Sequence, residues 1–264
     1  MSREPKMHIQ GAELGHHPEA SALNSSFRSD TPILKLRLDI RWDPEDTIVE
    51  LAALEHRLVQ LCPSLRQHRC RGREEYHILR NVDAPGPSGE TQQAFVEAPL
   101  ALAHLFEHVL IDAIAYITDA PTVSGATAAL LGSRTRFDLF VESPDDVVAF
   151  LTVKLAAGWI GDLVVGASPD GERRTTLELS RHLYRSQPDP VETGQAARSL
   201  GRPSCEVQHG FEWLEHRGLT RRVGYTMNFS GLCYYGLPAT AWPSTSAAQE
   251  PAARPAILGT NSPG

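Results

Sequence analysis

The sequence has 264 residues, of which 41% are hydrophobic and 22% charged, a composition typical of globular proteins and long enough for two modest domains. The first thirty residues contain no apolar run, which argues against a signal peptide or membrane anchor, so we expect a cytoplasmic protein without membrane contact. Four cysteines have spacings typical of neither a disulfide framework nor a paired-cysteine zinc site, and we expect reduced thiols. They are Cys62, Cys70, Cys205 and Cys233.

The net charge of −7 is concentrated in the front part of the chain. Residues 31–165 contain 12 lysines and arginines against 19 aspartates and glutamates, whereas residues 172–237 contain 9 against 7. An acidic surface attracts cations at long range, so we expect the front part to favour a cationic partner.

The first predicted elements follow a polar N-terminus. Residues 1–30 lack hydrophobic periodicity, which predicts a disordered tail. Leucines at alternate positions predict a half-buried strand at 33–40. Asp43 is a candidate N-cap for a helix over 44–61, with proline at its first position. A second strand is expected at 76–82, followed by a loop rich in proline and glycine.

The longest predicted helix, at 99–116, has apolar residues that recur every three and four positions. A strand is expected at 137–142, and the Ser-Pro-Asp-Asp sequence after it is expected to cap a helix that ends near Ala157. Residues 162–166 are predicted to form a fourth strand. This order suggests an α+β or α/β layer of helices packed on one sheet. Of the two we expect an α+β domain over 31–168, with helices packed on a small mixed sheet.

The pattern changes after a turn at 168–171, which we interpret as a linker. Three short helices and a hairpin are expected beyond it, at 176–185, 192–200, 205–216 and 220–235. Residues 238–264 are rich in proline, alanine, serine and threonine, so we expect a second disordered tail there.

The sequences QAARSLG at 195–201 and WLEHRGL at 213–219 resemble a winged helix-turn-helix domain, which we expect over 172–237. A DNA-reading helix carries basic or amide side chains toward the major groove, whereas residues 204–216 include three glutamates. This composition argues against DNA as a partner. Three arginines around the hairpin could still contact DNA phosphates. Such residues more often simply lie exposed to solvent at the edge of a hairpin. The three are Arg217, Arg221 and Arg222.

The strongest candidate for chemistry is the sequence HLFEH at 104–108, inside the longest predicted helix. His104 and His108 are four residues apart, so their imidazoles project from one face and can bind one zinc ion. Glu107 is offset from that line, so it can act as general base on a water molecule at the metal. The order His-x-x-Glu-His is that of the inverted zinc hydrolase motif.

A zinc site needs a third protein ligand, with water in the fourth position. Two carboxylates are candidates: Glu142 at the end of a predicted strand, and Asp112 one turn further along the helix. The alternative is a helix whose two histidines sit at the edge of the core while Glu107 faces solvent.

Three segments together resemble the N-terminal domain of cyanophycin synthetase. They are LCPSLRQHRC at 61–70, HLFEHVL at 104–110 and FDLFVE at 137–142 with the acidic helix start after it. The similarity covers roughly 31–160. Cyanophycin synthetase polymerises aspartate and arginine with two ATP-dependent ligase domains, and its N-terminal domain is understood to bind the polymer. In some members that domain carries a zinc-peptidase-like site that clips the polymer into primers.

The resemblance implies His104 and His108 as zinc ligands, Glu107 as catalytic base and Glu142 as a weaker match for the third ligand. The chain also departs from the family. Residues 91–97 replace the glycine-rich segment that usually precedes the histidine-bearing helix, so a different substrate groove is expected. No ATP-binding ligase region or Gly-x-x-x-x-Gly-Lys-Ser/Thr loop follows, so we do not expect ligase activity.

Two functions of different classes fit these features. The first is a zinc-dependent hydrolase, resembling a metallopeptidase, that cleaves amide bonds of cyanophycin or an arginine-rich peptide. The acidic front part suits such a substrate. The second is a non-catalytic module that binds a polymer or peptide and uses the winged helix for interaction or regulation.

Overall fold

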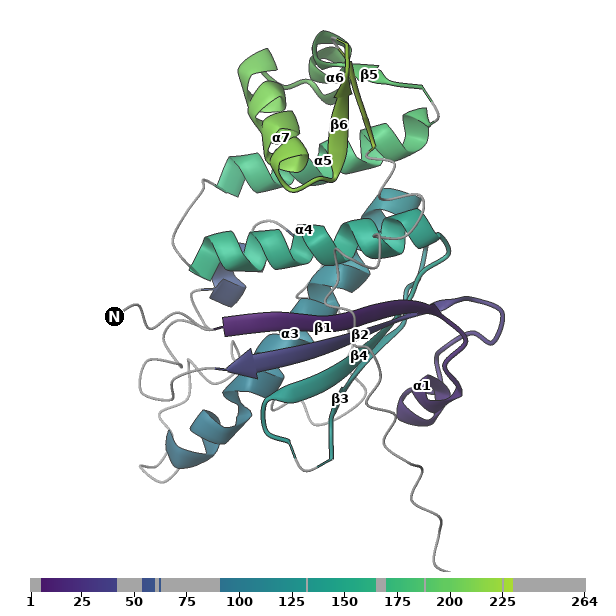
Figure 1. Ribbon diagram of the computed structural model, residues 1–264, viewed down its shortest axis with the longest axis vertical. Coiled ribbons are helices and arrows are strands. Elements are labelled where there is room, and N and C mark those ends of the chain that lie inside the picture. Colours follow the sequence, from purple (N-terminus) through teal and green to yellow (C-terminus); the bar gives the residue numbers. More distant parts are fainter. Residues whose placement is uncertain are drawn as a thin grey trace, which may run out of the picture.

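A computed structural model of the chain describes residues 6–41, 54–59, 62, 91–131, 133–164, 170–187, 189–224 and 226–229 (Figure 1). The fold is α+β, as predicted, and consists of two antiparallel sheets packed with helices. The expected strand at 76–82, most of the helix over 44–61 and the tail at 238–264 lie outside the described residues.

The larger sheet has four strands in the order β1-β2-β4-β3. They are β1 (Lys6–Gly15), β2 (Ile33–Arg41), β3 (Gly125–Ala129) and β4 (Arg136–Glu142). All three pairings are antiparallel, so the expected mixed sheet is corrected in this detail. One of the pairings, β2 with β4, brings together segments far apart in sequence, since Leu36 lies opposite Leu139.

The two faces of this sheet differ because successive residues of a strand point to opposite sides. One face belongs to the main hydrophobic core, to which β2 and β4 contribute Leu34, Leu36, Leu38, Ile40, Phe137, Leu139 and Val141. The other face carries charged side chains and a small apolar cluster in which Ile33 and Phe140 pack with Ala20 of α1 (Pro18–Leu23). Whether a side chain of β2 or β4 lies in the main core or on the opposite, charged face therefore depends on its position in the strand.

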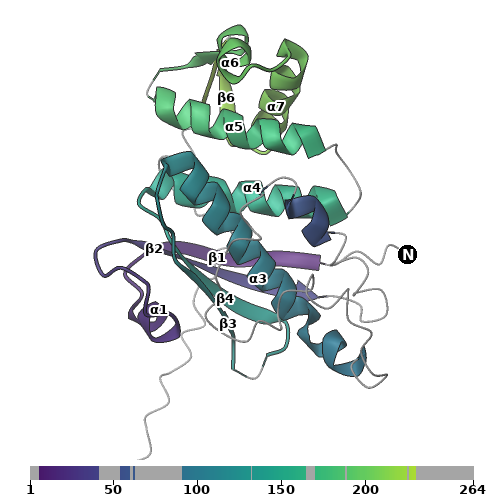
Figure 2. The same ribbon diagram turned by 180° about the vertical axis from the view of Figure 1, so that it is seen from behind.

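Two long helices cover the core face. Helix α3 (Thr91–Thr118) crosses β3 and β4, and α4 (Asp146–Val164) packs beside it (Figures 1 and 2). The segment Pro99–Thr118 is long and apolar enough to cross a membrane, but most of it is buried inside this fold. Its apolar composition is accounted for by its place at the centre of the core.

The N-terminal segment is ordered from Lys6 onward, so the predicted disorder of residues 1–30 is wrong for the part that the structure describes. Strand β1 does alternate, but the pairing register shifts between Ile9 and Gly11. Met7 and Ile9 before this irregularity, and Ala12 and Leu14 after it, pack against the core. The extra residue breaks the period of two, which hides the strand in the sequence.

Two further expectations near the sheet need correction. The strand predicted at 162–166 is helical through Val164, because Trp159, Ile160 and Leu163 bury one face at helical spacing. Conversely, β3 was not predicted, since its sequence GATAA has little of the β-branched and aromatic content typical of strands. Short apolar runs and small-residue strands are the segments that periodicity identifies least well.

The C-terminal part consists of a helix, a short strand, two helices and a hairpin, in that order (Figure 1). The helices are α5 (Asp170–Ser186), α6 (Thr193–Leu200) and α7 (Ser204–His216). The strands β5 (Val191–Glu192), β6 (Thr220–Val223) and β7 (Thr226–Phe229) form a sheet in the order β5-β7-β6. Helix α5 begins at Asp170, so the expected linker at 168–171 is partly helical.

The two parts share one continuous core, and α4 lies between the larger sheet and α5 in both views (Figures 1 and 2). The fully buried Trp159 indole donates a hydrogen bond to Thr176 Oγ1 at 3.1 Å. Asp162 accepts from Trp213 Nε1 at 2.9 Å and from Arg217 at 2.6 Å. The Arg217 guanidinium also lies 3.8 Å from the centroid of the Trp213 ring.

Close approach of helix α4 to this cluster requires a glycine. A Cβ atom at Gly158 would lie 2.8 Å from Arg217 Nε and 2.9 Å from the Trp213 ring, closer than carbon atoms normally pack. The glycine at 158 therefore allows the C-terminal part to sit directly on α4.

We expect Asp162→Ala to lower the free energy of unfolding by about 1–3 kcal/mol, because it leaves the Trp213 and Arg217 donors without their acceptor. Urea denaturation followed by tryptophan fluorescence measures the change. The control is Arg222→Ala, which removes an exposed ion pair with Glu215 and should change stability by less than about 0.5 kcal/mol. Equal effects of the two variants would show that this contact does not hold the two parts together.

Candidate metal centre

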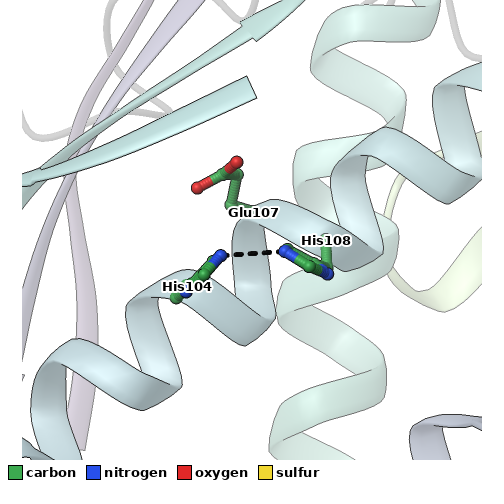
Figure 3. Close-up of side chains that lie close together, drawn as sticks. All are labelled: His104, Glu107 and His108. Atoms are coloured by element: carbon green, nitrogen blue, oxygen red, sulfur yellow. Dashed lines mark hydrogen bonds between the residues drawn. The ribbon is translucent and has the colours of Figure 1, made fainter. Parts of the chain in front are cut away.

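The centre of α3 presents two histidines that converge on one point. His108 is buried and His104 half-buried, and their Nε2 atoms lie 2.8 Å apart, within hydrogen-bonding distance (Figure 3). The rings are nearly perpendicular, at 76°, so the nitrogen atoms rather than the ring faces meet. This convergence follows from the spacing of four residues, which is close to one helical turn.

The donor set fits a zinc ion with a small adjustment. Imidazole nitrogens bound at about 2.0–2.1 Å to a tetrahedral ion lie about 3.3 Å apart, so the pair must open by about half an ångström. Glu107 lies close by, and one ligand atom from each of His104, Glu107 and His108 falls within 4.8 Å of the others. These three side chains are therefore near enough to share one ion.

The Glu107 side chain points away from the histidine pair, toward the strands (Figure 3). Its carboxyl is buried and its Oε2 atom accepts a hydrogen bond from Thr127 Oγ1 of β3. Burial raises the pKa of Glu107 to about 7, and the hydrogen bond from Thr127 opposes that rise. Glu107 is thus not the solvent-exposed residue that the alternative interpretation of this helix required.

Glu142 does not join the cluster, which corrects its expected role as third ligand. Its neighbour Val141 faces the α3 side, so Glu142 points to the opposite face of the sheet. There the backbone N–H of Arg28 donates to Glu142 Oε1 at 2.6 Å, and that of Ser124 to Oε2 at 3.1 Å. The Arg28 guanidinium lies 3.2 Å from Oε2, so this carboxylate holds the loop after α1 in place.

The other candidate, Asp112, is buried on α3 one turn beyond His108. Its charge acts on Cys62: burial and then the negative charge of Asp112 raise the pKa of that thiol. Within the described part of the chain, no cluster of metal-binding side chains includes Asp112. The His104–Glu107–His108 group therefore stands without a fourth protein ligand among the described residues.

Sequence reasoning missed two residues that position Glu107, namely Thr127 and Gly125. Both lie on β3, opposite Leu139 and Val141 respectively, and face α3. A Cβ atom at Gly125 would lie 2.5 Å from Glu107 Oε1, so only glycine leaves room for the carboxylate. No signal in the sequence links this small-residue strand to the helix, because the contact depends on how β3 packs.

The three arginines expected near the hairpin of the C-terminal part differ in their surroundings. Arg217, expected near the wing, is used in the contact with Asp162 and Trp213. Arg221 and Arg222 on β6 are exposed, and Arg222 lies 3.2 Å from Glu215 at the end of α7. The α7 surface also carries the exposed Glu206 and Glu212.

Comparisons with models of protein families, with curated protein sequences and with solved structures give no significant match.

Proposed function

We propose that the protein is a metal-dependent hydrolase of amide bonds, in which His104 and His108 bind a zinc ion and Glu107 is the general base. The observation that carries this proposal is the convergence of two Nε2 atoms, 2.8 Å apart, beside a buried carboxylate bonded to a neighbouring strand. Zinc, when bound, would polarise the substrate carbonyl and acidify the attacking water.

Each of the three side chains has a separate task in this reaction. His104 and His108 supply neutral nitrogen ligands from one rigid helix, which fixes the spacing of the donors. Glu107 accepts the proton of the attacking water and passes it to the leaving nitrogen. Its carboxylate lies close to the histidine nitrogens, where it can reach a water molecule at the metal.

For the substrate we propose cyanophycin or a related arginine-rich peptide. Two features support this choice: the resemblance of residues 31–160 to the cyanophycin synthetase N-terminal domain, and the acidity of the front part of the chain. An acidic surface would attract guanidinium groups and raise the local concentration of such a polymer.

The second candidate function is a non-catalytic polymer-binding or peptide-binding module. One observation favours it: the cluster provides only two imidazoles and one carboxylate among the described residues. A catalytic zinc site ordinarily has three protein ligands. If Glu107 served as the third ligand, no base would remain in the cluster.

Metal analysis together with a cleavage assay separates the two functions. We expect the purified protein to bind about one zinc ion per chain and to release shorter fragments from cyanophycin or an arginine-rich peptide. A chelator should stop the release, and added zinc should restore it. Zinc-loaded protein that binds one of these substrates without cleaving it would favour the non-catalytic module, and protein that binds no zinc would contradict both the metal site and the hydrolase.

A further inference from the structure

Glu107 is within reach of two different roles. Its carboxylate is near enough to the histidine nitrogens to share an ion with them, yet its side chain is directed toward the strands (Figure 3). As a ligand it would complete the coordination of the metal, and as a base it must stay off the metal. The position of the Glu107 carboxylate therefore has to be fixed by residues outside α3.

Strand β3 supplies that constraint from two adjacent positions on its α3-facing side. Thr127 Oγ1 donates a hydrogen bond to Glu107 Oε2. Two residues earlier, Gly125 lies so close that any Cβ atom would be 2.5 Å from Glu107 Oε1 and 2.7 Å from Ile111 Cδ1. The carboxylate is thus bonded at one oxygen and packed against backbone at the other.

We propose that β3 acts as a clamp, in which Thr127 and Gly125 hold the Glu107 carboxylate off the histidine pair so that it serves as base rather than ligand. This inference rests on the proposed hydrolase function and adds Thr127 as a positioning residue, which acts only through Glu107. Residues that orient groups around a metal in this way typically affect affinity or activity by about 10–100-fold.

Cobalt(II) provides a probe of the ligand set, because its visible absorption depends on the number and type of ligands. In Thr127→Val, which keeps the side-chain shape but loses the donor, we expect Glu107 to join the metal. The cobalt spectrum should change and metal affinity should rise, because a carboxylate ligand is added to the two imidazoles. The kcat for peptide cleavage should fall by about 10–100-fold while KM stays within about twofold.

Two further variants make the test specific. Thr127→Ser restores the hydroxyl and should return both the cobalt spectrum and kcat to those of the wild type. Thr118→Val removes a hydroxyl from α3 itself, where it bonds to the carbonyl of Ile114, and should change neither. If Thr127→Val does not fold, Gly125→Ala tests the same clamp, because its Cβ must displace the carboxylate.

The outcomes distinguish the clamp from the hydrolase. Wild-type protein that binds no cobalt would remove the metal site and the clamp together. Wild-type protein that binds cobalt and cleaves peptide, with a Thr127→Val variant identical to it in spectrum and kcat, would overturn the clamp alone. A changed spectrum in Thr127→Val that serine reverses would support the clamp even if no peptide substrate were cleaved.

Discussion

Replacing His104 and His108 together by alanine is expected to abolish zinc binding. Among the described residues, their two nitrogens are the only imidazole ligands in the cluster, and loss of both leaves a single carboxylate. Loss of outer partners of a metal site already costs about 10–100-fold in affinity, so we expect a loss of more than about 100-fold here. Zinc content after gel filtration and titration with a competing chelator measure the change.

The double variant is also the cleaner test of the two histidines. A single replacement would leave one ring without the partner that now lies 2.8 Å away, which adds a folding cost to the metal effect. His209→Ala, on the exposed surface of α7, is the matched control and should retain full metal content. Stoichiometric zinc in the double variant would rule out this centre.

The parts of this fold that periodicity predicts are those where local pattern and packing agree. Helix α3 is apparent because Phe106, Val109, Leu110 and Ala113 recur at helical spacing and all become buried. Strands β2 and β4 pair without a register shift, and their predicted bounds nearly match the observed ones. Strand β1 differs, because the irregularity after Ile9 shifts its alternation by one position.

In the candidate site, too, local spacing predicts some residues, whereas the place of others depends on tertiary packing. His104, Glu107 and His108 lie within one turn of a helix, so their grouping follows from spacing alone and could be predicted. Glu142 could not be placed correctly, because the choice between the two faces of β4 depends on which face α3 covers. Thr127 approaches Glu107 only through the packing of β3 against α3, and twenty residues separate them.

Glu107→Gln is expected to keep zinc while losing hydrolysis. The amide preserves the size of the side chain and can still accept the hydrogen bond from Thr127, but it cannot take a proton from water. General base catalysis contributes about 10²–10⁴-fold, so we expect kcat to fall by about that factor while substrate affinity is kept. Initial rates of fragment release and equilibrium binding of the uncleaved polymer measure the two quantities separately.

Asp112→Asn makes the same carboxylate-to-amide change on α3, at a buried position outside the metal-binding group, and serves as the matched control. We expect it to keep both zinc and hydrolysis. If Glu107→Gln instead loses zinc as the double histidine variant does, then Glu107 is a ligand, since a base that stays off the metal contributes nothing to its retention. The chain would then hold zinc through His104, Glu107 and His108, and the non-catalytic binding module would replace the hydrolase as the better account of its function.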